Sequence, residues 1–232
     1  MCFSASASFI AGASLSAVGG LTLVKTERPA EIPFATIPLL FGIQQITEGI
    51  IWLTFGLDAP LLKSTMTLVY SLFSHVLWPI FIPFSIVLLE TGPWRKKTIS
   101  ALQLTGISVG LYLLYFILKF PVTAEVVGTH IVYDSPHFYI LVVMALYLAA
   151  TCASCLVSSH KMINLFGALL LVSFIAAYEI HIASLVSVWC FFAAILSLIV
   201  YLYFKYGNSR VPILTNDTCQ NGSIFSRVAK KP

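Results

Sequence analysis

The chain has 232 residues, of which 59% are hydrophobic, 13% are aromatic and only 9% are Asp, Glu, Lys or Arg. Soluble globular proteins contain roughly 45–50% apolar and about 25% charged residues, so this composition excludes a water-soluble protein. Intrinsic disorder is excluded as well, because disordered chains are poor in aromatic residues and rich in charge. The composition predicts an integral membrane protein.

The predicted fold class is all-α, a polytopic membrane protein with seven transmembrane helices. A transmembrane helix needs about 20 mainly apolar residues, because the hydrocarbon core is roughly 30 Å thick. Seven stretches meet this requirement: about 4–24, 32–55, 64–89, 99–118, 138–157, 163–182 and 184–206. The last two come from one apolar stretch that is too long for a single span, and we expect it to turn between Glu179 and Ser184. Residues 1–206 are thus expected to form one seven-helix domain, followed by a mobile cytoplasmic tail at 207–232.

The Lys and Arg residues predict the orientation. With seven spans, eleven of these 13 cations fall on one side of the membrane, and only Lys63 and Lys119 fall on the other. Cytoplasmic loops carry the excess of Lys and Arg, which places the N-terminus outside and the C-terminus in the cytoplasm. The first cation, Lys25, follows the first apolar stretch, so that stretch is not expected to be a cleavable signal peptide. We therefore attribute the net charge of +4 to the cations of the cytoplasmic loops and tail. The expected partner is the lipid bilayer and not nucleic acid.

Polar residues within the spans gather in the outer half of the predicted bundle. Glu48 and Glu179 each lie sixteen residues into an outward-running span, about 24 Å above the cytoplasmic end at 1.5 Å per residue. His75 lies between the outer third and the midplane, and His181 lies at the outer turn. The inner half of the bundle is predicted to be almost purely apolar. The longest outer connection, Lys119 to His137, is expected to cap the outer mouth.

Glu48 is the most informative of these residues. Inserting an ionisable group into a membrane costs roughly 2.5–3.5 kcal/mol, and such groups normally face the bundle interior. Gln44 and Gln45 lie one turn before Glu48 and Trp52 lies one turn after it, which gives a polar stripe along one face. The stripe indicates a functional or paired carboxylate. The alternative is a structural stripe that joins helices by hydrogen bonds.

His75 is followed by two prolines at helical spacing. Pro79 and Pro83 lack N–H groups, so they free the carbonyls of His75 and Pro79, four residues before each. Ser71 and Trp78 share the face of His75. This arrangement favours a site for water, a proton or a metal, and the alternative is a buried histidine satisfied by a single hydrogen bond.

The cysteines divide into three kinds. Cys2 would become N-terminal if the initiator methionine is trimmed, and its amine and thiol could chelate a metal or act as a nucleophile. Cys152 and Cys155 lie deep in the inner half of the fifth span and are interpreted as small packing residues. Cys190 shares a face with Ser187 and could join the outer polar cluster. No disulfide framework is indicated.

Several segments carry a resemblance to a known family. They are the opening Met-Cys-Phe-Ser-Ala, the second-span Ile-Pro-Leu-Leu-Phe-Gly-Ile-Gln-Gln-Ile-Thr-Glu-Gly-Ile-Ile-Trp, the third-span Ser-His-Val-Leu-Trp-Pro, Ser-Ser-His at 158–160 and Ser-Val-Trp-Cys-Phe-Phe at 187–192. Together they resemble an uncharacterised family of prokaryotic seven-span membrane proteins. The resemblance implies a location in the inner (plasma) membrane, and it implies no activity.

Better-known seven-span classes do not match. Retinal proteins need a lysine in the middle of the last span, and its absence here excludes a retinal Schiff base. Alkaline-ceramidase and adiponectin-receptor-like hydrolases hold zinc with histidines on the last span, which has none here. A three-plus-one-plus-three transporter repeat would align Glu48 with Glu179, but the surrounding identities are at chance level.

The sequence therefore favours an integral membrane protein with an outward-facing intramembrane polar site that binds a metal ion or a small ligand. A metal-dependent hydrolase is one protein of this kind. For zinc or another divalent metal the expected ligands are Glu48, His75 and His181, because a catalytic zinc takes three protein ligands and a water, and Cys2 is the candidate for a fourth ligand. Glu48, His75 and Cys2 are also the candidate catalytic residues. Further ligand-binding residues are Gln44, Ser71, Trp78 and Glu179. The alternatives are a small transporter or sensor that uses Glu48 and His75 for protons or substrate, and a structural subunit without chemistry.

Overall fold

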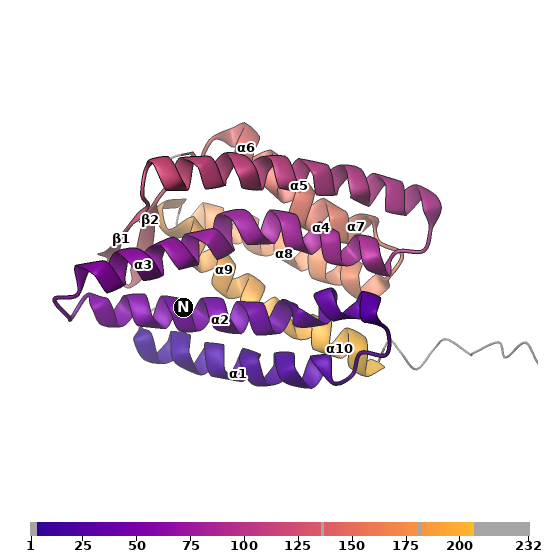
Figure 1. Ribbon diagram of the computed structural model, residues 1–232, viewed down its shortest axis with the longest axis horizontal. Helices are drawn as coiled ribbons and strands as arrows, with labels where there is room; N and C mark the ends of the chain where they lie inside the picture. The colour runs from indigo at the N-terminus through magenta and orange to yellow at the C-terminus, as the bar shows by residue number, and fades with distance from the viewer. Residues whose placement is uncertain (1–3, 136, 181, 207–232) are drawn as a thin grey trace, which may run out of the picture.

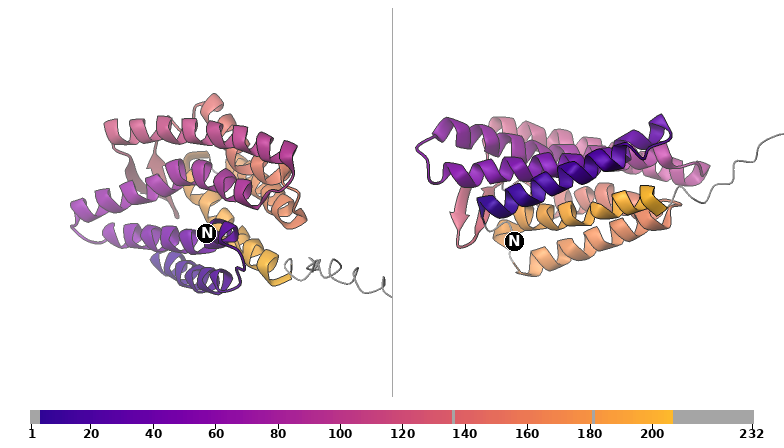
Figure 2. Two further views of the ribbon diagram at one scale, coloured as in Figure 1. Left: turned by 45° about the vertical axis from the view of Figure 1, so that its right-hand side comes forward. Right: turned by 90° about the horizontal axis from the view of Figure 1, so that it is seen from below.

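The computed structural model describes residues 4–135, 137–180 and 182–206. Cys2, His181 and the predicted tail at 207–232 lie outside the described residues. The chain forms a bundle in which successive helical segments run back and forth side by side (Figure 1). Seen from below, α8, α9 and α10 form a layer beneath the one that holds α1 to α4 (Figure 2).

The prediction of a helical architecture is confirmed. The first half of the chain contains α1 (Ala5–Leu23), η1 (Pro29–Glu31), α2 (Ile32–Thr54), α3 (Pro60–Ser71), η2 (Leu72–Leu77), α4 (Trp78–Leu89) and α5 (Pro93–Lys119). The second half contains β1 (Thr123–Val127), β2 (His130–Asp134), α6 (Leu141–Leu148), η3 (Ala149–Ala153), α7 (Ser154–Val157), α8 (Lys161–Ile180), η4 (Ile182–Ser184), α9 (Leu185–Leu196) and α10 (Leu198–Tyr206).

Six helices in the described residues are long and apolar enough to cross a membrane, whereas seven were predicted. They are Ala5–Leu23, Pro29–Thr54, Pro60–Leu89, Pro93–Lys119, Lys161–Glu179 and Leu185–Tyr206. The predicted fifth span, 138–157, corresponds to a shorter apolar helical segment, Leu141–Val157. The helical segment is shorter because it begins later than predicted. Residues 137–140 are not helical, and Ile140, whose backbone is extended, caps the start of α6.

The predicted third span is one long helical segment with a π-helical centre. The N–H of Trp78 donates to the carbonyl of Phe73, five residues back, at the end of η2. Pro79 and Pro83 follow, and a Cβ on Gly106 of α5 would clash with the Pro79 carbonyl oxygen that Pro83 leaves free. The side-chain amide of Gln103 donates to the carbonyl of Ile80 at 3.1 Å. The close approach of α5 therefore covers the Pro79 carbonyl, one of the two that the prolines leave free.

The connection between α5 and α6 is a β-hairpin, so the all-α prediction was incomplete. β1 and β2 pair antiparallel with Val127 opposite His130, which leaves a two-residue turn. Gly128 in that turn has φ +64°, the left-handed conformation that such tight hairpin turns require. Within β2, Ile131 and Tyr133 are buried and alternate with more exposed residues. The hairpin therefore directs one face into the bundle.

The bundle has two distinct ends. The hairpin and the α2–α3 turn lie at one end, and the α4–α5 and α7–α8 turns lie at the other (Figure 1). Under the predicted orientation the hairpin end is the outer end. A buried carboxylate also lies at the opposite end, because Glu90, which caps the end of α4, is only 2% exposed.

Candidate functional site

The hairpin end of the bundle contains a buried carboxylate that is contacted from distant parts of the chain. Glu48 of α2 is fully buried, and the hydroxyl of Ser187 in α9 donates to its Oε1 at 2.6 Å. The hydroxyl of Tyr133 in β2 makes a longer contact to the same oxygen at 3.5 Å. The ring of Tyr133 stacks on Tyr70 of α3 at 4.4 Å between centroids. We call these four residues, Glu48, Tyr70, Tyr133 and Ser187, the Glu48 cluster.

Each residue of the Glu48 cluster is positioned by the local structure of its element. The polar stripe of α2 is buried along its length, with Gln44, Gln45 and Glu48 all at 0% exposure. The period-two pattern of β2 turns Tyr133 inward, and Ser187 lies in the first turn of α9, directly after η4. The outer loop thus contributes a hydroxyl to the site that it was expected to cap.

Gln44 connects the Glu48 cluster to α4. Its side-chain oxygen accepts a hydrogen bond of 2.8 Å from the indole N–H of Trp78. The indole stacks on Phe41 of α2 with centroids 3.9 Å apart and planes at 17°. Cys190 of α9 is buried close to Gln44, Tyr70 and Glu48.

Several polar atoms beside Glu48 are buried without a protein partner in the part of the chain that the structure describes. They are Nε2 of Gln44 and both side-chain amide atoms of Gln45. A buried donor or acceptor that stays unpaired costs about 1–3 kcal/mol. Two adjacent amides with this cost, one turn before a buried carboxylate, indicate a site where non-protein groups supply hydrogen bonds.

His75 has different partners from Glu48. Its Nδ1 lies 2.7 Å from the hydroxyl of Ser74, and its ring meets Phe138 edge-on at 4.8 Å. The hydroxyl of Tyr147 donates to the Ser74 carbonyl at 2.6 Å, which ties η2 to α6. Nε2 of His75 is buried and has no hydrogen-bond partner among the described residues. His75 therefore belongs to a neighbouring polar group, next to the wall formed by α6.

The other predicted site residues are spread more widely. Ser71 is buried and its hydroxyl donates to the Thr67 carbonyl within α3. Glu179 is exposed near the end of α8, away from the buried stripe. Cys2 and His181 lie outside the described residues. Among the residues that are described, no three His, Cys, Asp or Glu side chains are placed to hold a metal ion, so the predicted metal set gains no support there.

Sequence reasoning missed the buried carboxylate of Glu90, at the opposite end. Its oxygens accept hydrogen bonds from the N–H of Ser159 at 2.8 Å, the hydroxyl of Ser158 at 3.4 Å and the N–H of Gly92 at 3.1 Å. Burial acts to raise the pKa of Glu90, but these hydrogen bonds and the charge of His160 outweigh it and hold the pKa below its usual value. The available signal was a single carboxylate just before a run of cations. Glu90 joins the α4–α5 turn to the α7–α8 turn.

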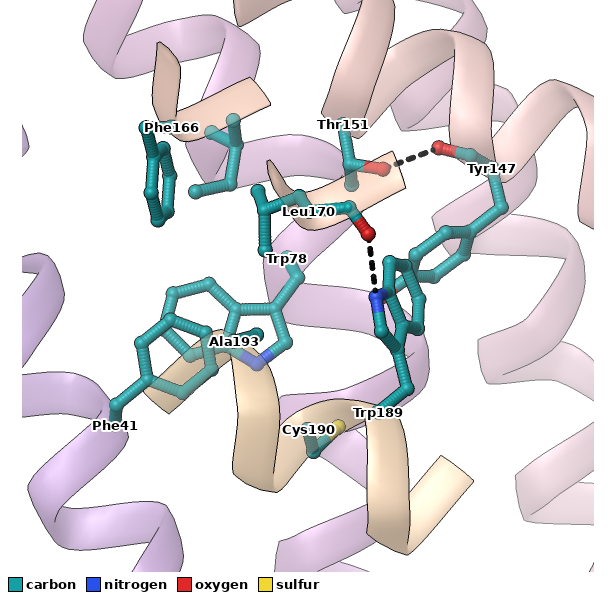
Figure 3. A pocket seen from close by; sticks show the side chains of 10 residues that line it. Phe41, Trp78, Tyr147, Thr151, Phe166, Leu170, Trp189, Cys190 and Ala193 are labelled. Carbon is teal, nitrogen blue, oxygen red and sulfur yellow. Dashed lines mark hydrogen bonds between the residues drawn. The ribbon is translucent and has the colours of Figure 1, made fainter. Parts of the chain in front are cut away.

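A small cavity lies in the core, next to Gln44 and Cys190. Its volume is about 30 Å³, enough for one or two water molecules. Figure 3 shows Phe41 and Trp78 on one side of it, with Tyr147 and Trp189 on another. The indole N–H of Trp189 donates to the Leu170 carbonyl at 3.1 Å, so it is satisfied within the wall. The cavity is therefore aromatic and apolar, and it lies alongside the polar stripe of α2.

Comparison with known proteins identifies a family and no activity. No curated protein and no solved structure matches the chain. Residues 1–214 match the model of DUF6629, a family of unknown function, and they include every element described above. The chain belongs to the DUF6629 family.

Proposed function

We propose that this protein is a seven-pass membrane protein whose outer end binds a small ligand that carries a cationic or hydrogen-bond-donating group. In this proposal the N-terminus is outside, the segment Leu141–Val157 completes the seven passes, and the protein resides in the inner membrane of a prokaryote. The cation distribution and the six long apolar helices support the proposal.

The single observation that carries the proposal is the buried Glu48 cluster. Four elements that are distant in sequence, α2, α3, β2 and α9, supply its side chains. A buried carboxylate in hydrocarbon is strongly disfavoured unless it is paired or hydrogen-bonded. The hydroxyls of Ser187 and Tyr133 donate hydrogen bonds to Glu48. The amide of Gln45, buried one turn before Glu48 without a partner among the described residues, adds a donor and an acceptor with which a ligand at this site could bond.

The ligand preference follows from the chemistry of the lining groups. Glu48 offers acceptor oxygens, and the stacked rings of Tyr70 and Tyr133 offer aromatic faces, which attract cations. The amides of Gln44 and Gln45 provide both donors and acceptors. This set suits an ammonium or a polyhydroxyl group, and it disfavours an anion such as a phosphate.

A transporter or sensor fits this site better than a metal-dependent hydrolase. The helix beside the site contains the π-helical segment η2, and a second π-helical segment, η3, lies in the facing wall. Such segments occur mostly at functional sites and interrupt the regular hydrogen-bond ladder. A wall of this kind can rearrange around a ligand, whereas a hydrolase would need a gathered set of metal ligands or catalytic groups.

The experiment compares ligand-induced stabilisation in wild type, Glu48→Gln and Glu179→Gln. Purified protein in lipid nanodiscs is heated with short-chain amines, polyols, short-chain carboxylates and divalent metals, each tested alone. At 100 times the Kd, a ligand stabilises the folded state by about 2.7 kcal/mol. We expect stabilisation by amines or polyols in wild type and in Glu179→Gln, whose substituted residue is exposed, and its loss in Glu48→Gln.

Two outcomes would contradict the proposal. One is an absence of stabilisation by every class of compound, and the other is stabilisation that survives in Glu48→Gln. Stabilisation by zinc alone, lost in both Glu48→Gln and His75→Gln, would instead favour the metal-binding alternative.

A further inference from the structure

The end of the bundle opposite the hairpin is rich in cations. The chain passes from α1 to η1, from α4 to α5 and from α7 to α8 at this end, and α10 ends there as well (Figure 1). Among the described residues, seven Lys and Arg residues but only three carboxylates lie at this end. The cations come from the α1–η1 connection, the first turns of α5 and α8, and the last turn of α10. The surface at this end therefore carries a net positive charge.

The carboxylates at this end leave most of these cations unpaired. Arg28 and Glu31 form an ion pair at 2.8 Å, and Glu31 also accepts hydrogen bonds from the backbone N–H groups of Glu27 and Arg28. Glu90 is buried and accepts hydrogen bonds from the two turns that it joins. Glu27 is exposed, and no cation of the described chain lies within ion-pair distance of its carboxylate. Six of the seven cations therefore have no carboxylate partner among the residues that the structure describes.

Two of the unpaired cations converge on one aromatic ring. Lys25 directly follows the cap of α1, and Lys205 lies in the last turn of α10, a helix that packs against α1. The ammonium nitrogens of both residues lie 6.0 Å from the centroid of the Tyr201 ring. We call Lys25, Tyr201 and Lys205 the Tyr201 clamp. Like charges repel, so an anion that bonds to both ammonium groups would offset an unfavourable interaction that the fold builds in.

The other unpaired cations do not converge in this way. Arg95 lies over the ring of its own chain neighbour, Trp94, at 5.5 Å. Lys96 and Lys97 follow in the same turn of α5, and successive residues point about 100° apart around a helix. Lys161 begins α8. The Tyr201 clamp therefore differs from the rest of the cationic surface, because it brings ammonium groups from two helices to one place.

An apolar surface adjoins the Tyr201 clamp on both helices. Leu21 lies one turn before Lys25, and both Leu21 and Val24 are exposed. On α10, Leu198 and Leu202 are exposed within two turns of Lys205. In the proposed topology these side chains face the hydrocarbon of the cytoplasmic leaflet, and Tyr201 lies near the interface, where tyrosines are enriched.

We infer that the Tyr201 clamp binds the phosphate of an anionic phospholipid of the cytoplasmic leaflet, whose acyl chains lie against the exposed apolar side chains of α1 and α10. The inference rests on the membrane topology in the proposed function, but not on the ligand at Glu48. Phosphate oxygens accept short, charge-assisted hydrogen bonds from ammonium groups, and cationic pockets between helices on the cytoplasmic side bind anionic head groups. A soluble anion would use the cations but not the apolar surface beside them.

The first test measures head-group preference. Phosphatidylglycerol and phosphatidylcholine with the same acyl chains are titrated into the purified protein in micelles, and bound lipid is counted by native mass spectrometry. A cation near an anionic lipid surface strengthens binding by about fivefold. We expect phosphatidylglycerol to bind wild type at least tenfold more tightly than phosphatidylcholine. In the double variant Lys25→Gln with Lys205→Gln the two affinities should agree within threefold.

Two control variants match this change. The double variant Lys96→Gln with Lys97→Gln removes the same charge from the same end, and it should alter the preference less than twofold. Lys63→Gln removes a lysine that also lies over an aromatic ring, that of Phe55 at 4.5 Å, but at the hairpin end. It should leave the preference unchanged. The substituted lysines of the clamp are exposed, so thermal unfolding in phosphatidylcholine should be the same in the clamp variant as in wild type.

The second test locates the head group. Phosphatidylglycerol with a diazirine on its glycerol head group is photolysed in nanodiscs, and cross-linked peptides are quantified. We expect residues 20–28 and 198–206 to be labelled at least fivefold more strongly than residues 55–63 at the opposite end. This difference should disappear in the double variant Lys25→Gln with Lys205→Gln. Both leaflets of a nanodisc contain the same lipid, so the result does not depend on the orientation of the protein.

The outcomes separate this inference from the ligand site at Glu48. Equal affinity of wild type for the two lipids would overturn the inference and leave the proposed ligand site intact. A loss of preference in Lys96→Gln with Lys97→Gln as large as that in the clamp variant would also overturn it, because binding would then follow the general charge of this end. Displacement of phosphatidylglycerol by millimolar inorganic phosphate would assign the clamp to a soluble anion and refute the lipid as its occupant.

Discussion

Replacing Ser187 by alanine tests the Glu48 cluster most simply. The Ser187 hydroxyl donates to Glu48 Oε1 at 2.6 Å, and both residues are fully buried. Its removal takes one donor from a buried carboxylate, and hydrogen bonds to charged groups are worth about 1.5–3 kcal/mol. We therefore expect Ser187→Ala to lower the free energy of unfolding by about 2 kcal/mol. Ser197→Ala is the control, because that hydroxyl is equally buried but bonds only to the Ala194 carbonyl of its own helix.

The assay is a double-mutant cycle with Glu48→Gln, measured by reversible unfolding in mixed micelles. Residues in direct contact typically couple by 0.5–3 kcal/mol, whereas distant residues add to within about 0.5 kcal/mol. We expect a coupling above about 1 kcal/mol for Ser187 with Glu48 and none for Ser197 with Glu48. Additive effects of Ser187→Ala and Glu48→Gln would refute the hydrogen bond and, with it, the cluster.

Three further predictions concern packing, pH and topology. Gly106→Ala should destabilise the protein by about 1–3 kcal/mol, because its Cβ would clash with the Pro79 carbonyl oxygen, whereas Gly20→Ala, with nothing within 4 Å, should not destabilise it. Thermal unfolding of both variants checks this. The lowered pKa of Glu90 means that its carboxylate stabilises the fold above its unfolded-state value of 4.5 and loses that contribution as the pH falls through the folded-state pKa. The stability of wild type should thus fall more steeply below about pH 4.5 than that of Glu90→Gln, and parallel pH profiles would be inconsistent with this account. A reporter that is active only in the cytoplasm should be silent when inserted at Glu125 and active when fused after Pro232, and the opposite pattern would reverse the proposed orientation.

The elements that follow from local patterns were predictable from the sequence. Apolar stretches of sufficient length placed the helices, and the polar turn expected between Glu179 and Ser184 coincides with η4, Ile182–Ser184. The hairpin was not predicted, although Gly128 and the alternation of β2 were both readable. The apolar spans on either side of that loop favoured an all-α fold, in which the loop was expected only to cap the bundle.

The composition of the site was predictable only in part. Glu48 and Gln44 were predicted because they form a polar stripe within a single apolar helix, and helical spacing along that one helix is sufficient to reveal the stripe. Tyr133 was missed because its role depends on how the hairpin docks between α3 and α9, which no periodicity encodes. His75 and Trp78 were assigned to one face by regular helical spacing, but the π-helical turn shifts that spacing, and the two side chains have different partners.

The most direct test of the central claim is an experimental density map of the protein in nanodiscs, at a resolution that reveals ordered water. The account predicts non-protein density within hydrogen-bond distance, about 2.7–3.2 Å, of Gln44 Nε2 or the Gln45 amide, and next to Glu48. A map in which both amides bond to protein groups and the side chains around Glu48 close on one another, with no such density, would contradict it.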